Sequence, residues 1–387
     1  MKKISRAIVQ YIKETDKFLW LVFLLISTYG ALLVYSATRT APSSSAFRTQ
    51  IIAVFLGYIA AIVISKINYK KIAALWPVIV VLCLGFMAAT SVFGIRVSGA
   101  DDKAWIMLPG GISFQPSELV KIGFIVTFAK HLDVLREHGK LKSFLHICLL
   151  AVHMAIPVGI IHLQGDDGAA LVFFFIFLAM CFGAGVQLRY FAATFGAILI
   201  AVPLAWKYVL NTDQKKRFEI LLDHTIDPLG YGFQQGQGEI SIGSGMVTGR
   251  GLFQGPRVAS GIVPEDHNDF IFSVAGEELG FVGCVLILLL MLAVLIRLIM
   301  IARSAADPMG SYMCYGFFGL IAFQTIGNVG MCLYLLPVVG ITLPFFSAGG
   351  SSTACLYLGV GLMQSVYMFR HDTDQVYTLR RRAAWQE

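Results

Sequence analysis

Three carboxylates and one imidazole gather in the six residues from Pro264 to Asp269. Asp269 directly precedes an apolar stretch, so we expect it where a polar loop meets a buried helix. The helix dipole there favours the ionised carboxylate, whereas burial beside Phe270 and Phe272 raises its pKa. Such a carboxylate suits a general base that takes a proton from a hydroxyl group, with His267 nearby to bind substrate. The simpler alternative is that Asp269 caps the helix.

Charged residues also fall inside apolar stretches, where an unpaired charge costs several kcal/mol. Glu118 and Lys121 are three residues apart and share one helix face. They form either a self-neutralising pair or a polar site in which the Lys121 ammonium binds a phosphate-bearing ligand. One of Glu277 and Glu278 could partner a basic residue such as Lys121 or Arg217. The pair is either purely structural or a substrate contact, for which Glu277 is the candidate.

Two further segments are candidates for ligand binding. The glycine-rich stretch 230–251 fits no dinucleotide or P-loop spacing. Arg217, which precedes it, and Arg250, which lies within it, could hold an anion through forked hydrogen bonds. Solvent and lipid headgroups are their alternative partners. The stretch 336–352 interrupts an apolar region with Pro, Gly and Ser, including Ser351. Its small residues serve either to pack helices or to line a wet cavity.

The elements that must position these residues are membrane helices. The chain has 387 residues, of which 57% are hydrophobic and 14% are charged, and its mean hydropathy is +0.74. Soluble domains carry roughly 25% charged residues, and a bilayer-spanning helix needs roughly 20 apolar ones. The sequence predicts an all-α integral membrane protein with about ten transmembrane helices, at 18–37, 49–66, 72–94, 115–131, 144–162, 169–187, 190–209, 270–296, 311–335 and 345–369.

The distribution of basic residues predicts the topology. With ten spans both termini share one side, which receives 19 of the 30 Lys and Arg residues, whereas short loops on the other side receive four. Positive residues favour the cytoplasm, so we expect both termini there. The chain is then one membrane domain, 1–387, with an amphipathic N-terminal segment (1–16), one large extracytoplasmic loop between spans 7 and 8 (210–269) and a cytoplasmic tail (370–387).

The net charge of +7 is explained by this pattern, which indicates contact with anionic membrane lipids and no nucleic acid. The seven cysteines all lie in apolar segments without metal-ligand spacing, so we interpret them as small buried hydrophobic residues.

Four ordered motifs resemble the SEDS family (shape, elongation, division, sporulation), which includes FtsW, RodA and SpoVE. They are Phe114-Gln115-Pro116-Ser117-Glu118-x-x-Lys121, Pro264-Glu265-x-His267-x-Asp269-Phe270-Ile271-Phe272, Gly276-Glu277-Glu278-x-Gly280 and Leu343-Pro344-Phe345-x-Ser347-x-Gly349-Gly350-Ser351-Ser352. The stretch from Asp227 to Gly251 resembles the rod-shape RodA branch more than the division branch. Ala104 departs from the family, which usually has Arg before Trp105.

The resemblance implies a ten-helix peptidoglycan glycosyltransferase of the bacterial plasma membrane. Its substrate would be lipid II, the undecaprenyl-diphosphate-linked disaccharide peptide, and its partner a class B penicillin-binding protein acting as transpeptidase. It also implies that Asp269 is the essential catalytic residue, that Trp105 is functionally important, and that Glu118 and Lys121 belong to a central cavity.

The expected reaction is an inverting transfer with Asp269 as general base. Lys121, Arg217, Arg250 or a divalent cation (Mg²⁺ or Mn²⁺) would stabilise the leaving diphosphate, although no motif requires a metal. A precursor flippase or transporter, and a non-catalytic scaffold of the cell-wall synthesis complex, are the alternatives. Transporters often have paired interrupted helices, and the sequence predicts a break in the tenth span alone, which disfavours a transporter.

Overall fold

The computed structural model describes residues 9–40, 45–96, 102–108, 112–208, 210, 212–230 and 232–372. Most of them are helical. Residues 1–8 of the predicted amphipathic segment and 373–387 of the predicted tail lie outside this part of the chain. The helices are α2 (Lys17–Thr38), α3 (Ala46–Ser65), α4 (Tyr69–Ala74), α5 (Trp76–Phe93), α6 (Pro116–Glu137), α7 (Phe144–Leu163), α8 (Asp167–Gly183), α9 (Leu188–Tyr208), α10 (Thr212–Leu222), α11 (Phe233–Ser244), α12 (Pro256–Ser260), α13 (Ile271–Ser304), α14 (Pro308–Cys332) and α15 (Gly350–Met368).

Six of the described helices, α2, α3, α5, α7, α9 and α13, are long and apolar enough to cross a membrane. The chain is therefore a multi-pass membrane protein. Each of the ten predicted spans overlaps a long helix, although some boundaries were wrong. The third begins at Trp76 rather than 72, because Leu75 ends the short helix α4 and Pro77 favours a new first turn. The tenth begins at Gly350 rather than 345, because Phe345 has a positive φ of 67°.

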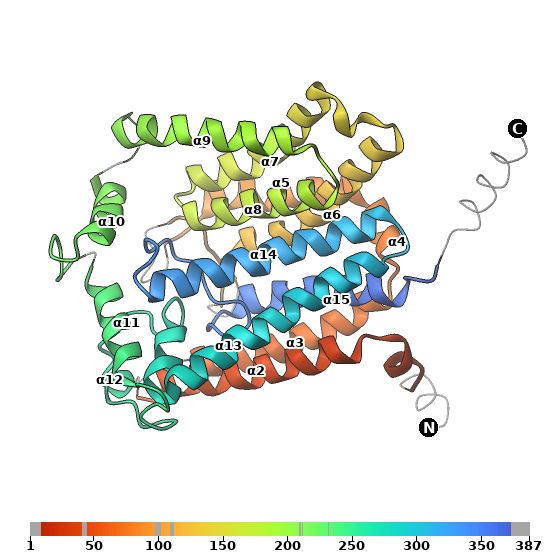
Figure 1. The fold of residues 1–387 in the computed structure, drawn as a ribbon. Helices are drawn as coiled ribbons and strands as arrows, with labels where there is room; N and C mark the ends of the chain where they lie inside the picture. Colours follow the sequence, from red (N-terminus) through yellow and green to blue (C-terminus); the bar gives the residue numbers. More distant parts are fainter. Residues whose placement is uncertain are drawn as a thin grey trace, which may run out of the picture.

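The long helices form one bundle (Figure 1). The described ends of the chain lie at one end of this bundle, and α10, α11 and α12 lie at the other end. These three helices belong to the predicted loop 210–269, so the loop contains more regular structure than its glycine content suggested. A different segment, between α5 and α6, contains a small antiparallel pair of strands, β1 (Ile106–Leu108) and β2 (Ile112–Phe114).

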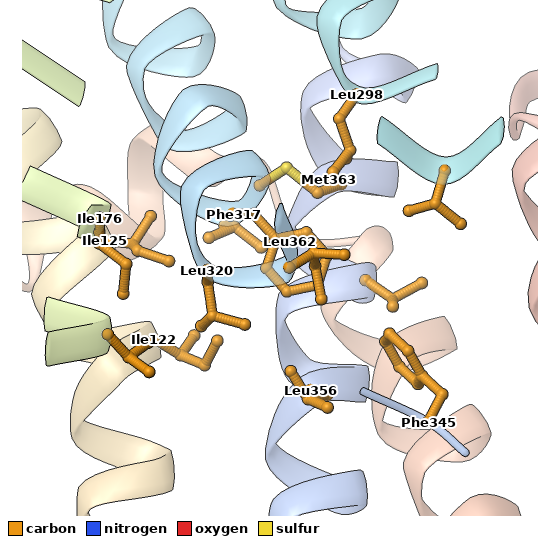
Figure 2. Packing of buried hydrophobic residues seen from close by; sticks show 14 of the residues in the cluster. Ile122, Ile125, Ile176, Leu298, Phe317, Leu320, Phe345, Leu356, Leu362 and Met363 are labelled. Carbon is orange, nitrogen blue, oxygen red and sulfur yellow. The ribbon is translucent and has the colours of Figure 1, made fainter. Parts of the chain in front are cut away.

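Helix α14 occupies the centre of the bundle, in contact with α6, α8 and α13. Figure 2 shows Phe317 and Leu320 of α14 between Ile125 of α6 and Leu362 of α15. Glycines allow the close approach: a Cβ at Gly319 would lie 2.7 Å from the Cβ of Ala179 in α8. The tight packing fixes the ends of these helices, which carry the polar residues described below.

Helix α13 is interrupted at Gly280, whose φ of 64° and ψ of −159° are open to glycine and costly for other residues. The segment 246–251 replaces the lost helical hydrogen bonds. Arg250 donates its backbone N–H to the carbonyl of Glu277 at 2.9 Å, and Phe281 donates to the carbonyl of Met246 at 2.9 Å. The prediction of an unbroken eighth span was therefore wrong, and the tenth-span region is not the only interruption in the described chain.

Candidate active site

Asp269 lies two residues before the first residue of α13. The helix begins with Phe270 at the N-cap position, and a phenylalanine side chain cannot accept a hydrogen bond there, so the prediction that Asp269 caps the helix was wrong. Burial raises the pKa of the Asp269 carboxyl to about 7, with a further contribution from the charge of Glu265 and an opposing one from His267. A carboxyl that titrates near neutral pH suits a general base.

The acidic loop before α13, residues 264–269, has a strained backbone and hydrogen bonds between its own side chains. Glu265 has a positive φ of 53°, and its carboxylate accepts a 2.7 Å hydrogen bond from the side chain of Asn268. His267 Nδ1 lies 3.4 Å from Asp266 Oδ1, and this contact raises the pKa of His267. The backbone carbonyl of His267 accepts from Ala348 at 2.8 Å, which ties the loop to the segment before α15.

A second carboxylate, Asp166, lies near Asp269 and was not predicted as a site residue. It caps α8 by accepting from the N–H of Ala169 at 2.9 Å, and Gln115 donates to it at 2.8 Å. Burial raises the pKa of Asp166 to about 6, and the charge of Asp102 contributes to that increase. The charges of Asp102 and Asp166 also contribute to the raised pKa of Asp269, which shows that these carboxylates share one electrostatic environment.

The predicted pair in α6 is confirmed as an ion pair. Lys121 Nζ lies 2.7 Å from Glu118 Oε1, and the two residues are 1% and 7% exposed. Both charges act on Asp166, so the pair borders the same group of carboxylates. Ser351 accepts a 3.4 Å hydrogen bond from the backbone of Gln115, the residue that precedes α6.

Trp105 lies next to β1 and accepts a backbone hydrogen bond from Ile95 at 2.8 Å. Its indole Nε1 is buried and has no hydrogen-bond partner in the part of the chain that the structure describes. An indole N–H in that state is available to a ligand. Next to it in the sequence, Ala104 is fully buried, and the family usually places a long arginine there.

The segment 338–341 covers Asp269 on another side. Arg217 of α10 donates to the carbonyl of Val338 at 3.0 Å. Gly340 has a φ of 66°, and a Cβ placed on it would lie 3.8 Å from Asp269 Oδ2. Arg217 is thus joined to the site through this segment.

Glu277 and Arg250 have other surroundings. Glu277 accepts from the backbone N–H groups of Arg257 and Val258, at 2.8 and 3.1 Å. The prediction of Lys121 or Arg217 as its partner was wrong, and these contacts favour the structural alternative. Arg250 has an exposed side chain, and Arg257 donates its Nε to Ser241 at 2.9 Å.

Residues that the sequence did not identify as site residues complete the arrangement. Asp166 and Gln115 each stand beside a helix start, a pattern that also fits ordinary capping, so the sequence alone could not separate the two roles. Asn328 lies in the middle of the apolar helix α14 and donates to the backbone carbonyl of Asp269 at 2.7 Å. Its polarity at membrane depth was the available signal.

Comparison with known proteins decides the family. A family profile described as cell cycle protein, covering FtsW, RodA and SpoVE, matches residues 16–372. The chain belongs to this family. The predicted resemblance is confirmed, and the predicted fold is confirmed as a RodA-like helical membrane fold.

The similar curated proteins include ones named FtsW, as in the division branch, and ones named MrdB. The chain is 32% identical over 367 residues to the probable peptidoglycan glycosyltransferase FtsW of Geobacter metallireducens, covering 92% of this chain and 95% of the relative. It is 30% identical over 355 residues to the peptidoglycan glycosyltransferase MrdB of Escherichia coli K12, covering 92% and 94%.

Solved structures agree with this. A chain from a structure titled as the structural coordination of polymerization and crosslinking by a peptidoglycan synthase complex is 29% identical, with a TM-score of 0.77 over 93% of this chain and 99% of that one. The rod shape determining protein RodA of Thermus thermophilus is 27% identical, with a TM-score of 0.67 over 93% and 98%.

Proposed function

We propose that this member of the FtsW/RodA/SpoVE family polymerises lipid II into glycan strands, with Asp269 as the general base. The chain is a peptidoglycan glycosyltransferase of cell-wall synthesis, as the names of its relatives indicate. The observation that carries the role of Asp269 is its position before the first turn of α13. Its carboxylate is partly buried, its pKa is raised to about 7, and polar groups from α6, α8 and the start of α15 surround the site.

In this mechanism the deprotonated Asp269 carboxylate accepts the proton of the 4-hydroxyl of the acceptor GlcNAc. The oxygen then forms a bond to the anomeric carbon of the donor MurNAc. The bond from that carbon to the diphosphate oxygen breaks, and the electron pair leaves with undecaprenyl diphosphate. A single displacement of this kind inverts the anomeric centre.

The charge that develops on the diphosphate needs cationic partners. Lys121 is a candidate because its charge acts on Asp166, whereas Arg217 would act from α10 and Arg250 from an exposed position. Trp105, with its unpaired indole N–H, His267 and Ser351 complete the proposed substrate-binding set. For Glu277 a substrate contact remains a prediction. Its hydrogen bonds with the backbone N–H groups of residues 257 and 258 favour a structural role instead.

A divalent cation stays a prediction. Among the residues that the structure describes, no three His, Cys, Asp or Glu side chains are grouped so that they could hold a metal ion. A cation that arrives with the diphosphate of the substrate would supply charge neutralisation near Asp166 and Asp102. The proton transfer from the sugar to Asp269 does not depend on it.

We further propose ten transmembrane spans with both termini in the cytoplasm and the site facing outward. The positive-inside pattern supports this topology, as does the placement of α10, α11 and α12 at the end of the bundle away from the described chain ends (Figure 1). A class B penicillin-binding protein is the proposed partner, because a similar solved chain belongs to a complex that couples polymerization and crosslinking. The role in elongation rests on the sequence features of the rod-shape branch.

The experiment is a reconstituted assay of the purified protein with lipid II, with and without its cognate transpeptidase. A polymerase releases undecaprenyl diphosphate and forms glycan strands. A flippase moves lipid II across liposomes without consuming it, and a scaffold consumes none whatever the partner. The sequence disfavoured a transporter because it predicted only one interrupted helix. The described chain is interrupted twice, at Gly280 and before α15, so that argument no longer holds. The assay is therefore what distinguishes a polymerase from a transporter.

A further inference from the structure

Asn328 is a fully buried amide in the apolar helix α14. Its Nδ2 group donates two hydrogen bonds, one to the backbone carbonyl of Asp269 at 2.7 Å and one to the carbonyl of Ile341 at 2.8 Å. The two acceptors are 72 residues apart in the sequence and both lie outside helices. One amide therefore joins the junction that carries the carboxylate to the segment that covers it.

The covering segment is held from two other sides. Arg217 donates to the carbonyl of Val338 at 3.0 Å. Gly168, in the first turn of α8, allows the carbonyl of Val339 to approach so closely that an added Cβ would lie 2.2 Å from that oxygen. With these anchors in place, Gly340 lies beside Asp269 Oδ2. Asn328 makes the shorter of the two side-chain contacts to the Asp269 carbonyl, the other coming from Cys332.

We propose that Asn328 is a positioning residue: by binding the carbonyls of Asp269 and Ile341 together, it holds the Asp269 carboxylate in the orientation that proton abstraction requires. This inference rests on the proposed function of Asp269. Cys332, one turn further along α14, lies 3.5 Å from the same Asp269 carbonyl but is a weak donor, so it does not replace the amide.

The geometry predicts a specific kinetic signature. A general base loses rate when it is misplaced by a fraction of an ångström to an ångström, even if substrate still binds. Loss of the amide also frees the junction to shift, and a carboxylate that leaves its buried position titrates closer to the ordinary value for aspartate. A residue that merely stabilises the fold changes neither property in the surviving folded protein.

The test compares Asn328→Leu and Asn328→Ala, which remove the amide without adding a charge, with the matched control Gln324→Met in the intact detergent-solubilised protein with its transpeptidase. Gln324 lies one turn earlier in α14, is 3% exposed, and has an amide oxygen without a partner among the described residues. We expect the Asn328 variants to lose about 10- to 100-fold in kcat with KM within about twofold, and the ascending limb of the pH profile to move to lower pH. We expect Gln324→Met to keep the kcat, the KM and the pH profile of the wild type.

Wild-type kcat and an unchanged pH profile in the folded Asn328 variants would overturn the inference, as would a loss confined to KM. If Asn328→Leu fails to fold, Asn328→Ser, which keeps one donor, provides the same comparison. Asp269→Asn separates this inference from the proposed function. Activity in Asp269→Asn removes the base assignment itself, whereas an inactive Asp269→Asn beside fully active Asn328 variants removes only the positioning role.

Discussion

Lys121 Nζ lies 2.7 Å from Glu118 Oε1 inside α6, and both side chains are almost completely removed from solvent. A buried ion pair adds little net stability, but removing one partner leaves the other charge uncompensated. Both charges also act on Asp166. The pair can therefore serve structure and substrate binding at once, and the two contributions are separable by mutation.

Lys121→Met is expected to lower the stability by about 3 kcal/mol or more, because it strands the Glu118 carboxylate, and to abolish polymerisation. The double variant Glu118→Gln/Lys121→Met removes both charges and should recover most of the thermal midpoint. If Lys121 binds the diphosphate, the double variant regains stability without regaining activity. Recovery of both together would assign the pair a purely structural role.

The rate of polymerisation should rise with pH through about 7. The pKa of Asp269 is raised from 3.8 to about 7 by burial and by Glu265, and only the deprotonated carboxylate accepts a proton. The same shift makes the folded protein bind a proton more readily than the unfolded chain, so this contribution to stability is present below about pH 4 and lost as pH rises to about 7. Initial rates of lipid II consumption between pH 5.5 and 8.5 measure the kinetic part, and a flat profile would contradict it.

Gly340→Ala should impair activity more than its cost to stability explains. The left-handed φ of 66° costs alanine about 1–2 kcal/mol. The new methyl group would lie in ordinary van der Waals contact with Asp269 Oδ2, at 3.8 Å, and would occupy space that substrate needs beside the carboxylate. Gly139→Ala is the matched control, because Gly139 has a φ of 65° and open space around it. Both variants should show similar thermal midpoints, and only Gly340→Ala should lose kcat. Equal activities would mean that the segment does not influence the carboxylate.

Glu278→Gln should loosen the segment around residue 253. The Glu278 carboxylate accepts from the hydroxyl of Ser36 at 2.6 Å and from the backbone of Phe253 at 3.1 Å and Gly255 at 3.4 Å. A hydrogen bond to a charged group contributes about 1.5–3 kcal/mol, so we expect a lower thermal midpoint and faster protease cleavage near residue 253. Glu137→Gln, at the exposed end of α6, should change neither. Unchanged protease resistance would show that the bonds are dispensable.

The sequence predicted the helices well where apolar runs are long and uninterrupted, since 18–37 and 144–162 differ from Lys17–Thr38 and Phe144–Leu163 by one residue at an end. Hydropathy could not reveal the kink at Gly280, because the hydrogen bonds that compensate it come from 246–251, a segment 29 to 34 residues earlier in the chain. For the same reason Glu277 and Glu278 resembled intramembrane site residues, although their partners are backbone N–H groups of the loop and, for Glu278, the hydroxyl of Ser36.

The site was predictable in its chemistry but not in its assembly. Asp269 stood out because its polar surroundings end abruptly at an apolar helix, and Glu118 with Lys121 because their spacing places them on one helix face. Asp166 and Asn328 join the group only through tertiary packing of α8 and α14. No local pattern distinguishes them from an ordinary helix cap or an isolated buried amide.

The most direct test of the central claim is the release of undecaprenyl diphosphate from lipid II by purified Asp269→Asn protein with its transpeptidase, beside the wild type under the same conditions. Removing a general base costs about 10²- to 10⁴-fold, and asparagine keeps the size of the side chain, so we predict a loss in that range with an unchanged thermal midpoint. Release within twofold of the wild type would contradict the assignment of Asp269 as the base.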